Sequence, residues 1–135
     1  MNKTFEISKT FYFDMTHRLS FHEGKCNNLH GHTYKLEVFV SGDLDKHGFV
    51  IDFGDLKKIV TEDIINLLDH TVAVYANDDL LVSAVCDKFQ TVLFPFETTA
   101  ENLCAWIAEK LQSRSLNISK IILWETPTNK AVLTL

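Results

Sequence analysis

Two long segments that alternate apolar and polar residues constrain the fold of this chain more than any other feature of its sequence. Residues 3–17 place apolar side chains at every second position, and residues 30–41 repeat the pattern. Because successive side chains of a strand point to opposite faces of a sheet, this period of two predicts two strands, each with one buried face. Lys9 interrupts the apolar face of the first strand, which favours a bulge or an edge at that point.

The rest of the chain predicts two clear helices and several shorter elements. Apolar residues at helical spacing indicate one helix after Asp52 that ends before Asp69, and another that begins at Thr98, where Glu101 gives the spacing of a capping box. Further strands are expected at residues 49–51, 92–94, 118–126 and 130–135, and a short helix within residues 77–89. This order predicts an α+β fold in which helices cover one face of an antiparallel sheet. Closure into an oligomeric barrel would cover the open edge of that sheet.

Length, charge and cysteine content argue against several classes of protein. At 135 residues the chain is expected to form one domain, residues 1–135. Its net charge of −5, without a basic block, argues against nucleic-acid binding, and no apolar run approaches the ~20 residues of a membrane span. The first six residues lack the apolar core of a signal peptide. The three cysteines show no CxxC spacing, so a reducing cytoplasm is the expected location.

Three histidines lie at the ends of the two long predicted strands. His30 and His32 alternate around Gly31, so both side chains leave the same face, and His17 ends the apolar face of the first strand. If the two strands are neighbours, three imidazoles converge at one end of the sheet. Three neutral imidazoles with a fourth position left open are a ligand set of catalytic zinc. The alternative is that they are ordinary strand-end histidines, but three on apolar faces favour a metal site.

Cys26 precedes these histidines in a polar loop and has two functional interpretations. It could be a fourth, structural metal ligand, or it could be a base beside the metal, where a cationic neighbourhood makes a thiolate available. A buried, inert thiol is the third interpretation. We apply that one to Cys86 and Cys104, which lie in apolar surroundings.

Two further polar features accompany apolar segments. The carboxylate of Asp69 could orient the adjacent His70 for proton transfer, although helix C-termini favour a cationic residue in any case. Glu125 alternates with apolar residues of its predicted strand, so it is either a half-buried carboxylate that needs hydrogen-bond donors or a strand-edge residue that faces solvent. His22, His47 and Glu23 share no apolar strand face and are expected in solvent.

The motif Cys-x3-His-Gly-His at residues 26–32 resembles that of the 6-pyruvoyltetrahydropterin synthase family. Within it, the sequence is most similar to the 6-carboxytetrahydropterin synthases of queuosine biosynthesis. The similarity covers most of the chain and extends to residues 16–19, 50–57, 68–70, 99–103 and 124–126. It implies the tunnelling fold (T-fold), whose units assemble into barrels, with sites between the subunits of a homohexamer.

The same resemblance implies a role for each candidate residue. It implies zinc held by His17, His30 and His32, and proton abstraction by Cys26. Asp69 and His70 would assist Cys26 in catalysis. Glu125 would anchor the pterin ring, and Thr98 or Thr99, at the start of a helix, would contact it.

The implied substrate is 7,8-dihydroneopterin triphosphate, and the implied products are 6-carboxytetrahydropterin, acetaldehyde and triphosphate. Two alternatives stay open. One is the sister reaction, which eliminates triphosphate to give 6-pyruvoyltetrahydropterin, and the other is a non-catalytic zinc- or pterin-binding module. The chain departs from the family pattern at residues 71–75, in the longer stretch 76–97, and at Thr98, where proline is common.

Overall fold

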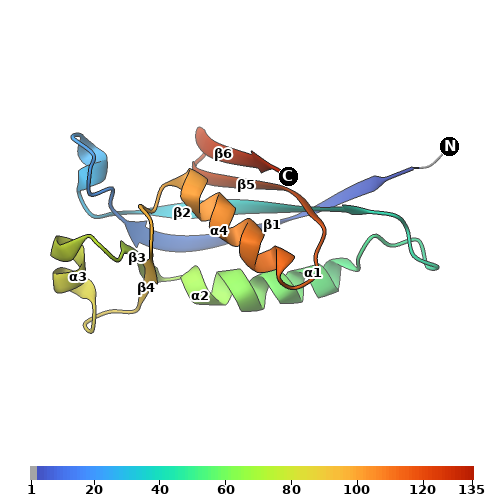
Figure 1. The fold of residues 1–135 in the computed structure, drawn as a ribbon, viewed down its shortest axis with the longest axis horizontal. Coiled ribbons are helices and arrows are strands. Elements are labelled where there is room, and N and C mark those ends of the chain that lie inside the picture. The colour runs from blue at the N-terminus through green and yellow to red at the C-terminus, as the bar shows by residue number, and fades with distance from the viewer. Residues whose placement is uncertain (1–2) are drawn as a thin grey trace.

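The computed structural model describes residues 3–135, so residues 1–2 of the predicted domain lie outside the described part of the chain. A six-stranded sheet with the strand order β4-β3-β1-β2-β5-β6 forms its framework (Figure 1). In chain order, its strands are β1 (Phe5–His17), β2 (His30–Gly42), β3 (Thr71–Tyr75), β4 (Thr91–Phe94), β5 (Ile118–Thr126) and β6 (Asn129–Thr134).

The two long alternating segments form strands, as predicted, and they lie at the centre of the sheet. β1 and β2 pair antiparallel along their whole length, from Phe5 opposite Gly42 to His17 opposite His30. This pairing runs through Lys9 without a register shift, so the bulge considered at Lys9 does not occur. The irregularities instead lie in the pairing of β5, opposite Phe39 of β2 and near Glu125.

The structure extends the predicted antiparallel sheet with two parallel strands. β3 pairs parallel to β1, and β4 pairs parallel to β3. β3 was not predicted, because its five residues are a short apolar run rather than an alternating one, as is typical of a strand buried on both faces. The predicted strand at residues 49–51 is wrong. Those residues form a bend, and the side chains of Val50 and Ile51 pack against the core without a partner strand.

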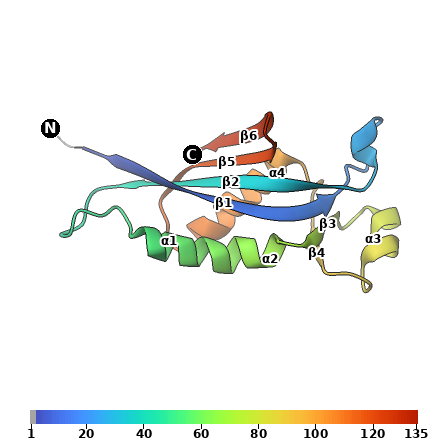
Figure 2. The same cartoon turned by 180° about the vertical axis from the view of Figure 1, so that it is seen from behind.

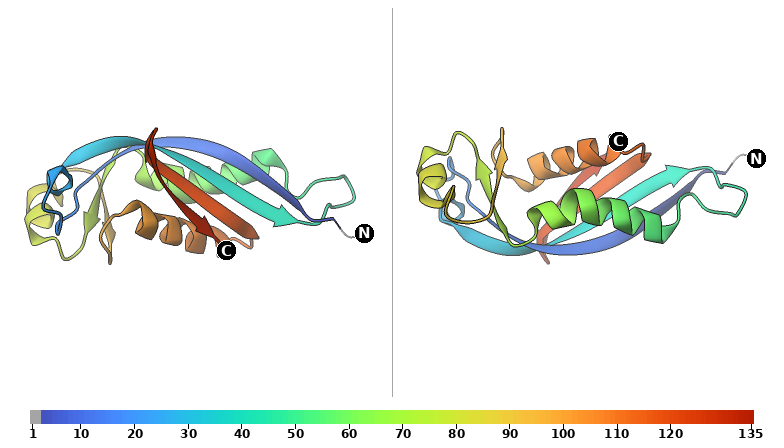
Figure 3. Two further views of the ribbon diagram at one scale, coloured as in Figure 1. Left: turned by 90° about the horizontal axis from the view of Figure 1, so that it is seen from above. Right: turned by 90° about the horizontal axis from the view of Figure 1, so that it is seen from below.

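Two helical segments lie on one face of the curved sheet (Figure 3). The first is a continuous rod of α1 (Phe53–Val60), a π-helical turn (Thr61–Ile65) and α2 (Asn66–Leu68). Asp52 caps it by accepting hydrogen bonds from the backbone of Gly54 and Asp55 at 2.7 and 3.2 Å. The second is α4 (Ala100–Gln112), which is capped by Thr99 rather than by Thr98. The main core lies between these helices and the sheet.

One end of the sheet carries most of the irregular structure. Figure 2 shows the loop after β1 and the short helix α3 (Asp79–Val85) at the end away from the N-terminus. The loop contains one 3-10 turn, Lys25–Asn27, which includes Cys26. Among residues 3–135, no helix is both long and apolar enough to cross a membrane.

Candidate metal and catalytic site

The fold brings His17, His30 and His32 together at this end of the sheet, and we call them the histidine cluster. One ring nitrogen of each lies within 4.8 Å of those of the other two. The ring centroids are 4.8 Å apart for His17 and His30, 5.2 Å for His17 and His32, and 4.8 Å for His30 and His32. The pairing of β1 with β2 explains this convergence. His17 lies directly opposite His30, and His32 lies two residues further along, opposite Met15 on the same face.

Hydrogen bonds to carbonyl groups orient two of these imidazoles. Nδ1 of His17 lies 2.9 Å from the carbonyl oxygen of Thr98 and 3.1 Å from its hydroxyl oxygen. Nδ1 of His30 lies 2.7 Å from the carbonyl oxygen of Asn28. A carbonyl oxygen can only accept, so both Nδ1 atoms carry the proton and both Nε2 atoms keep a free lone pair. This is the arrangement by which outer groups orient histidine ligands of metals.

Burial favours the neutral, metal-binding form of His17 and His32. His17 is 1% exposed, and its burial, reinforced by the nearby His30 and His32, lowers its pKa to about 4 from an ordinary value of 6.5. Burial, followed by the charge of His30, also lowers the pKa of His32. Neutral imidazoles are the species that coordinate zinc, so the donor set fits that metal.

Thr98 lies directly behind the His17 ring. It is completely buried, and its carbonyl and hydroxyl oxygens both face that ring. Thr99 caps α4 by accepting a hydrogen bond from the Asn102 backbone at 3.2 Å. Thr98 thus lies behind the histidine cluster, and Thr99 lies at the helix start. A contact of either threonine with substrate stays a prediction.

Glu125 points toward the histidine cluster. Its Oε1 lies 4.0 Å from Nε2 of His17, and its side chain is 24% exposed. Burial raises the pKa of this carboxyl. A cavity of about 600 Å³ has Glu125, His32 and Trp124 in its wall. Glu125 is therefore a half-buried carboxylate and not a strand-edge residue that faces solvent. The cavity that it faces is large enough for a small heterocycle.

Asp69 and His70, which we call the acid–base pair, lie at the end of the first helical rod. Oδ2 of Asp69 is 3.0 Å from Nδ1 of His70, and its Oδ1 accepts a 2.8 Å hydrogen bond from the Asp14 backbone. That backbone N–H, followed by the His70 ring, lowers the pKa of Asp69. His70 has φ of 62°, a left-handed conformation common just after a helix end. Its side chain is 75% exposed.

A second cavity connects the acid–base pair with the histidine cluster. Its volume is about 570 Å³, and its wall includes His70, Phe89, Gln90, Thr16 and His32. His32 also belongs to the wall of the cavity that contains Glu125. The histidine cluster thus lies between a carboxylate on one side and a carboxylate–imidazole pair on the other.

Cys26 is partly buried in its 3-10 turn and stands apart from both groups. Within residues 3–135, the set of mutually close ligand atoms at the histidine cluster does not include its thiol. Neither of the two cavities has Cys26 in its wall. This geometry argues against Cys26 as a fourth, structural metal ligand. Cys104 is buried and His22, Glu23 and His47 are exposed, as expected, whereas Cys86 is only partly buried.

The sequence reasoning did not identify Tyr34 as part of this region. Its ring stacks on Phe13 and meets the ring edges of His17 and His32 at centroid distances of 6.2 and 5.4 Å. Its hydroxyl is buried without a hydrogen-bond partner among the described residues, and this burial raises its pKa. The signal was its position two residues after His32, which places it on the same strand face.

The comparisons with known proteins agree with this architecture. The family model described as 6-pyruvoyl tetrahydropterin synthase matches residues 6–134. A protein of Haemophilus influenzae named 6-carboxy-5,6,7,8-tetrahydropterin synthase is 46% identical over 134 residues, which cover 93% of this chain and 95% of that protein.

Solved structures share the fold at lower identity. An uncharacterized protein of Wolinella succinogenes has a TM-score of 0.84 at 22% identity, with 98% of this chain and 99% of that chain covered. The 6-pyruvoyl tetrahydropterin synthase of Plasmodium falciparum has a TM-score of 0.76 at 23% identity, with 98% of each chain covered. The predicted T-fold is therefore confirmed, and the chain belongs to the 6-pyruvoyl tetrahydropterin synthase family.

Proposed function

We propose that this protein is a zinc-dependent lyase that converts 7,8-dihydroneopterin triphosphate into 6-carboxytetrahydropterin, acetaldehyde and triphosphate, as a step of queuosine biosynthesis. The observation that carries the proposal is the histidine cluster with two of its rings oriented by carbonyl groups and Glu125 beside it. The name of the Haemophilus influenzae relative, at 46% identity, supports this reaction over the sister reaction.

His17, His30 and His32 would hold the zinc ion. When bound, zinc supplies a Lewis acid that stabilises negative charge developing on substrate oxygens. The residues around it fit that purpose, because burial favours the neutral form of His17 and the carbonyl groups of Thr98 and Asn28 fix two of the rings. Three protein ligands also leave room for substrate, whereas a structural zinc site would be closed by a fourth.

Glu125 would bind the pterin ring. A pterin presents a ring N–H and an amino group side by side, and a carboxylate can accept from both at once. Burial raises the pKa of Glu125 despite the opposing charge of His30, and a pair of substrate donors would compensate that burial. The adjoining Trp124 gives the cavity wall an aromatic surface for a flat heterocycle.

Cys26 would remove a proton from the substrate side chain, and His70, oriented by Asp69, would relay a proton back. Elimination then releases triphosphate as an anion. One water molecule then adds as a side-chain carbon–carbon bond breaks, so that one carbon stays on the pterin as the carboxylate and the other two leave as acetaldehyde. Within the described residues, no hydrogen bond joins the Cys26 thiol to Asp69 or His70. We therefore propose that the site is completed between copies of the chain in a homohexamer, so that the exposed acid–base pair of one copy serves another.

Product analysis of the zinc-loaded protein tests the proposal. The protein is incubated with 7,8-dihydroneopterin triphosphate, and the products are identified by mass spectrometry. Cys26→Ala is the test variant, and Cys86→Ala is the matched control at a thiol outside the site. We expect 6-carboxytetrahydropterin and acetaldehyde from wild type and the control, and neither from Cys26→Ala. A 6-pyruvoyl product would assign the sister reaction, and no turnover would refute the proposed lyase activity.

A further inference from the structure

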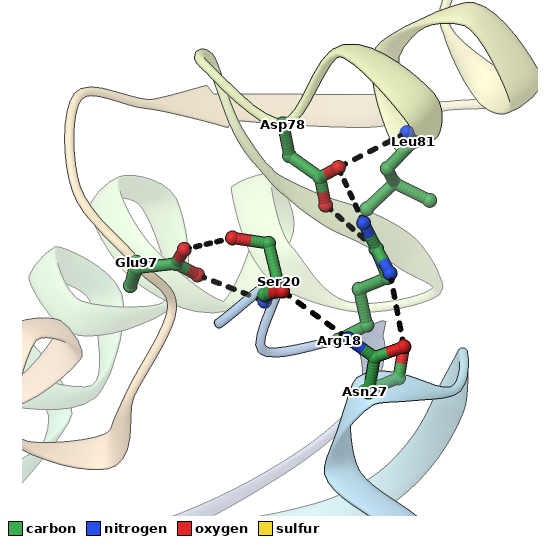
Figure 4. Close-up of polar contacts among 6 residues, drawn as sticks. All are labelled: Arg18, Ser20, Asn27, Asp78, Leu81 and Glu97. Carbon is green, nitrogen blue, oxygen red and sulfur yellow. Dashed lines mark hydrogen bonds and ion pairs between the residues drawn. The ribbon is translucent and has the colours of Figure 1, made fainter. Parts of the chain in front are cut away.

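Arg18 and Asp78 form a buried ion pair beside the candidate site (Figure 4). Nε and Nη2 of Arg18 each donate to one carboxylate oxygen of Asp78 at 2.7 Å. The Arg18 side chain is 12% exposed and that of Asp78 is 3% exposed. The Arg18 guanidinium lowers the pKa of Asp78, so the carboxylate stays charged. A bidentate pair of this kind fixes geometry more strictly than a single contact does.

The other side of the Arg18 guanidinium holds the turn that contains Cys26. Nη1 of Arg18 donates to the carbonyl oxygen of Asn27 at 3.1 Å. The backbone N–H of Leu19 donates to the carbonyl oxygen of Cys26 at 2.8 Å. The Asn27 amide also donates to the Ser20 carbonyl at 3.1 Å. Each of residues 18–20 thus supports the Cys26 turn through at least one hydrogen bond.

The same segment is tied to the support of the histidine cluster. Both the hydroxyl and the backbone N–H of Ser20 donate to the carboxylate of Glu97 (Figure 4). Glu97 immediately precedes Thr98, whose carbonyl oxygen accepts from His17. One polar network therefore contacts the chain next to Cys26 and next to the residue that orients His17.

Both acidic members of this network come from the stretch 76–97, where the sequence departs from the family pattern. Asp78 also accepts a 3.3 Å hydrogen bond from the Leu81 backbone, which caps α3. The cap fixes Asp78 at the start of the short helix, and the ion pair then fixes that helix against the loop after β1. The contacts suggest a purpose for this stretch beyond connecting β3 to α4.

We propose that the Arg18–Asp78 pair is a positioning clamp that holds the Cys26 turn in its reactive place relative to the histidine cluster. This inference rests on the proposed role of Cys26 as the base. Arg18 and Asp78 are positioning residues, because they act through the turn and not on the substrate. A base must be held within hydrogen-bond reach of the proton it removes, so a loosened turn slows the chemical step more than substrate binding.

Two variants test the clamp. Asp78→Asn keeps the size of the side chain and its ability to cap α3, but it removes the charge that holds Arg18. Arg18→Lys keeps the charge but loses the planar fork. Asp79→Asn removes an exposed carboxylate from the adjacent position and serves as the matched control. The first measurement is the alkylation rate of Cys26 by iodoacetamide, resolved by mass spectrometry of its peptide and compared with that of Cys86.

We expect Asp78→Asn to raise the alkylation rate of Cys26 about tenfold, because the turn opens more often, with the rate at Cys86 unchanged. Bound zinc should remain at the wild-type amount, and kcat should fall about tenfold with KM within about twofold of wild type. Arg18→Lys should change both quantities in the same direction by a smaller factor. If Asp78→Asn does not fold, Arg18→Lys decides the question by the same measurements.

The clamp would be overturned if Asp78→Asn and Arg18→Lys, like the control Asp79→Asn, kept the wild-type alkylation rate of Cys26 and the wild-type kcat. Alkylation needs neither substrate nor turnover, so its result is independent of the proposed reaction. Absence of tetrahydropterin products from the wild-type protein would refute the proposed function, while the alkylation rates would still decide whether the ion pair holds the Cys26 turn.

Discussion

The histidine cluster and the acid–base pair differ in how far one chain completes them. His17 is buried, and carbonyl oxygens orient its ring and that of His30. Among residues 3–135, Asp69 alone orients the His70 ring, and most of that ring's surface faces solvent. A metal must be held before any substrate arrives, whereas a proton relay is needed only around a bound substrate. This difference fits the proposal above, in which one chain builds the metal-binding part and a second copy, together with substrate, would finish the proton-transfer part.

The largest effect is expected on zinc binding, when a residue of the histidine cluster is removed. We expect His32→Ala to weaken zinc binding by more than about 100-fold, because loss of even an outer hydrogen-bond partner of a ligand costs about 10–100-fold. Zinc content after dialysis against a competing chelator, together with activity, measures this. His22→Ala, at an exposed histidine of the neighbouring loop, should behave as wild type. Equal zinc retention in both variants would refute the metal site.

Removal of the acid–base pair should affect catalysis but not the metal. For His70→Gln we expect kcat to fall about 100-fold or more, since a positioned acid or base typically contributes 10²–10⁴-fold. Zinc content should be unchanged, and the free energy of unfolding should stay within about 0.5 kcal/mol, because His70 is exposed. Steady-state kinetics and chemical denaturation measure the two quantities. A loss of zinc in this variant would show that the two regions are not separate.

Acid should destabilise the zinc-free protein through His17. Its pKa is about 4 in the folded chain and 6.5 ordinarily, so between these pH values only the unfolded chain binds the proton. The free energy of unfolding should therefore fall, by about 3 kcal/mol at most, as the pH drops from 6.5 to 4, with no contribution from His17 above 6.5. Urea denaturation of wild type and His17→Asn at a series of pH values measures this decrease in the free energy of unfolding. An equally steep decrease in the variant would contradict the assignment to His17.

The helix cap of Thr99 should have the smallest effect. Thr99→Ala removes the side-chain acceptor for the Asn102 backbone and should lower the free energy of unfolding by about 1 kcal/mol. Activity per folded molecule should stay near wild type if Thr99 only caps the helix. A marked rise in KM without this loss of stability would instead support the predicted contact with substrate.

Local patterns predicted the parts of the structure that depend on neighbours in sequence. Alternation predicted β1 and β2 as strands and put His30 and His32 on one face, and the antiparallel pairing found in the structure brings His17 beside them. β3 was not predicted, and β4 was predicted as a strand at residues 92–94 but without its parallel pairing, because that pairing depends on packing at the edge of the sheet. Partners 60 and 81 residues apart, Arg18 with Asp78 and His17 with Thr98, also leave no periodic signal.

The absorption spectrum of the cobalt-substituted protein tests the separation of metal and base most directly. Our account predicts the bands of a cobalt ion bound by imidazoles, without an intense thiolate-to-cobalt charge-transfer band, and an unchanged spectrum in Cys26→Ala. An intense charge-transfer band in wild type that disappears in Cys26→Ala would place the thiol on the metal. That result would contradict the proposed division between the histidine cluster and Cys26.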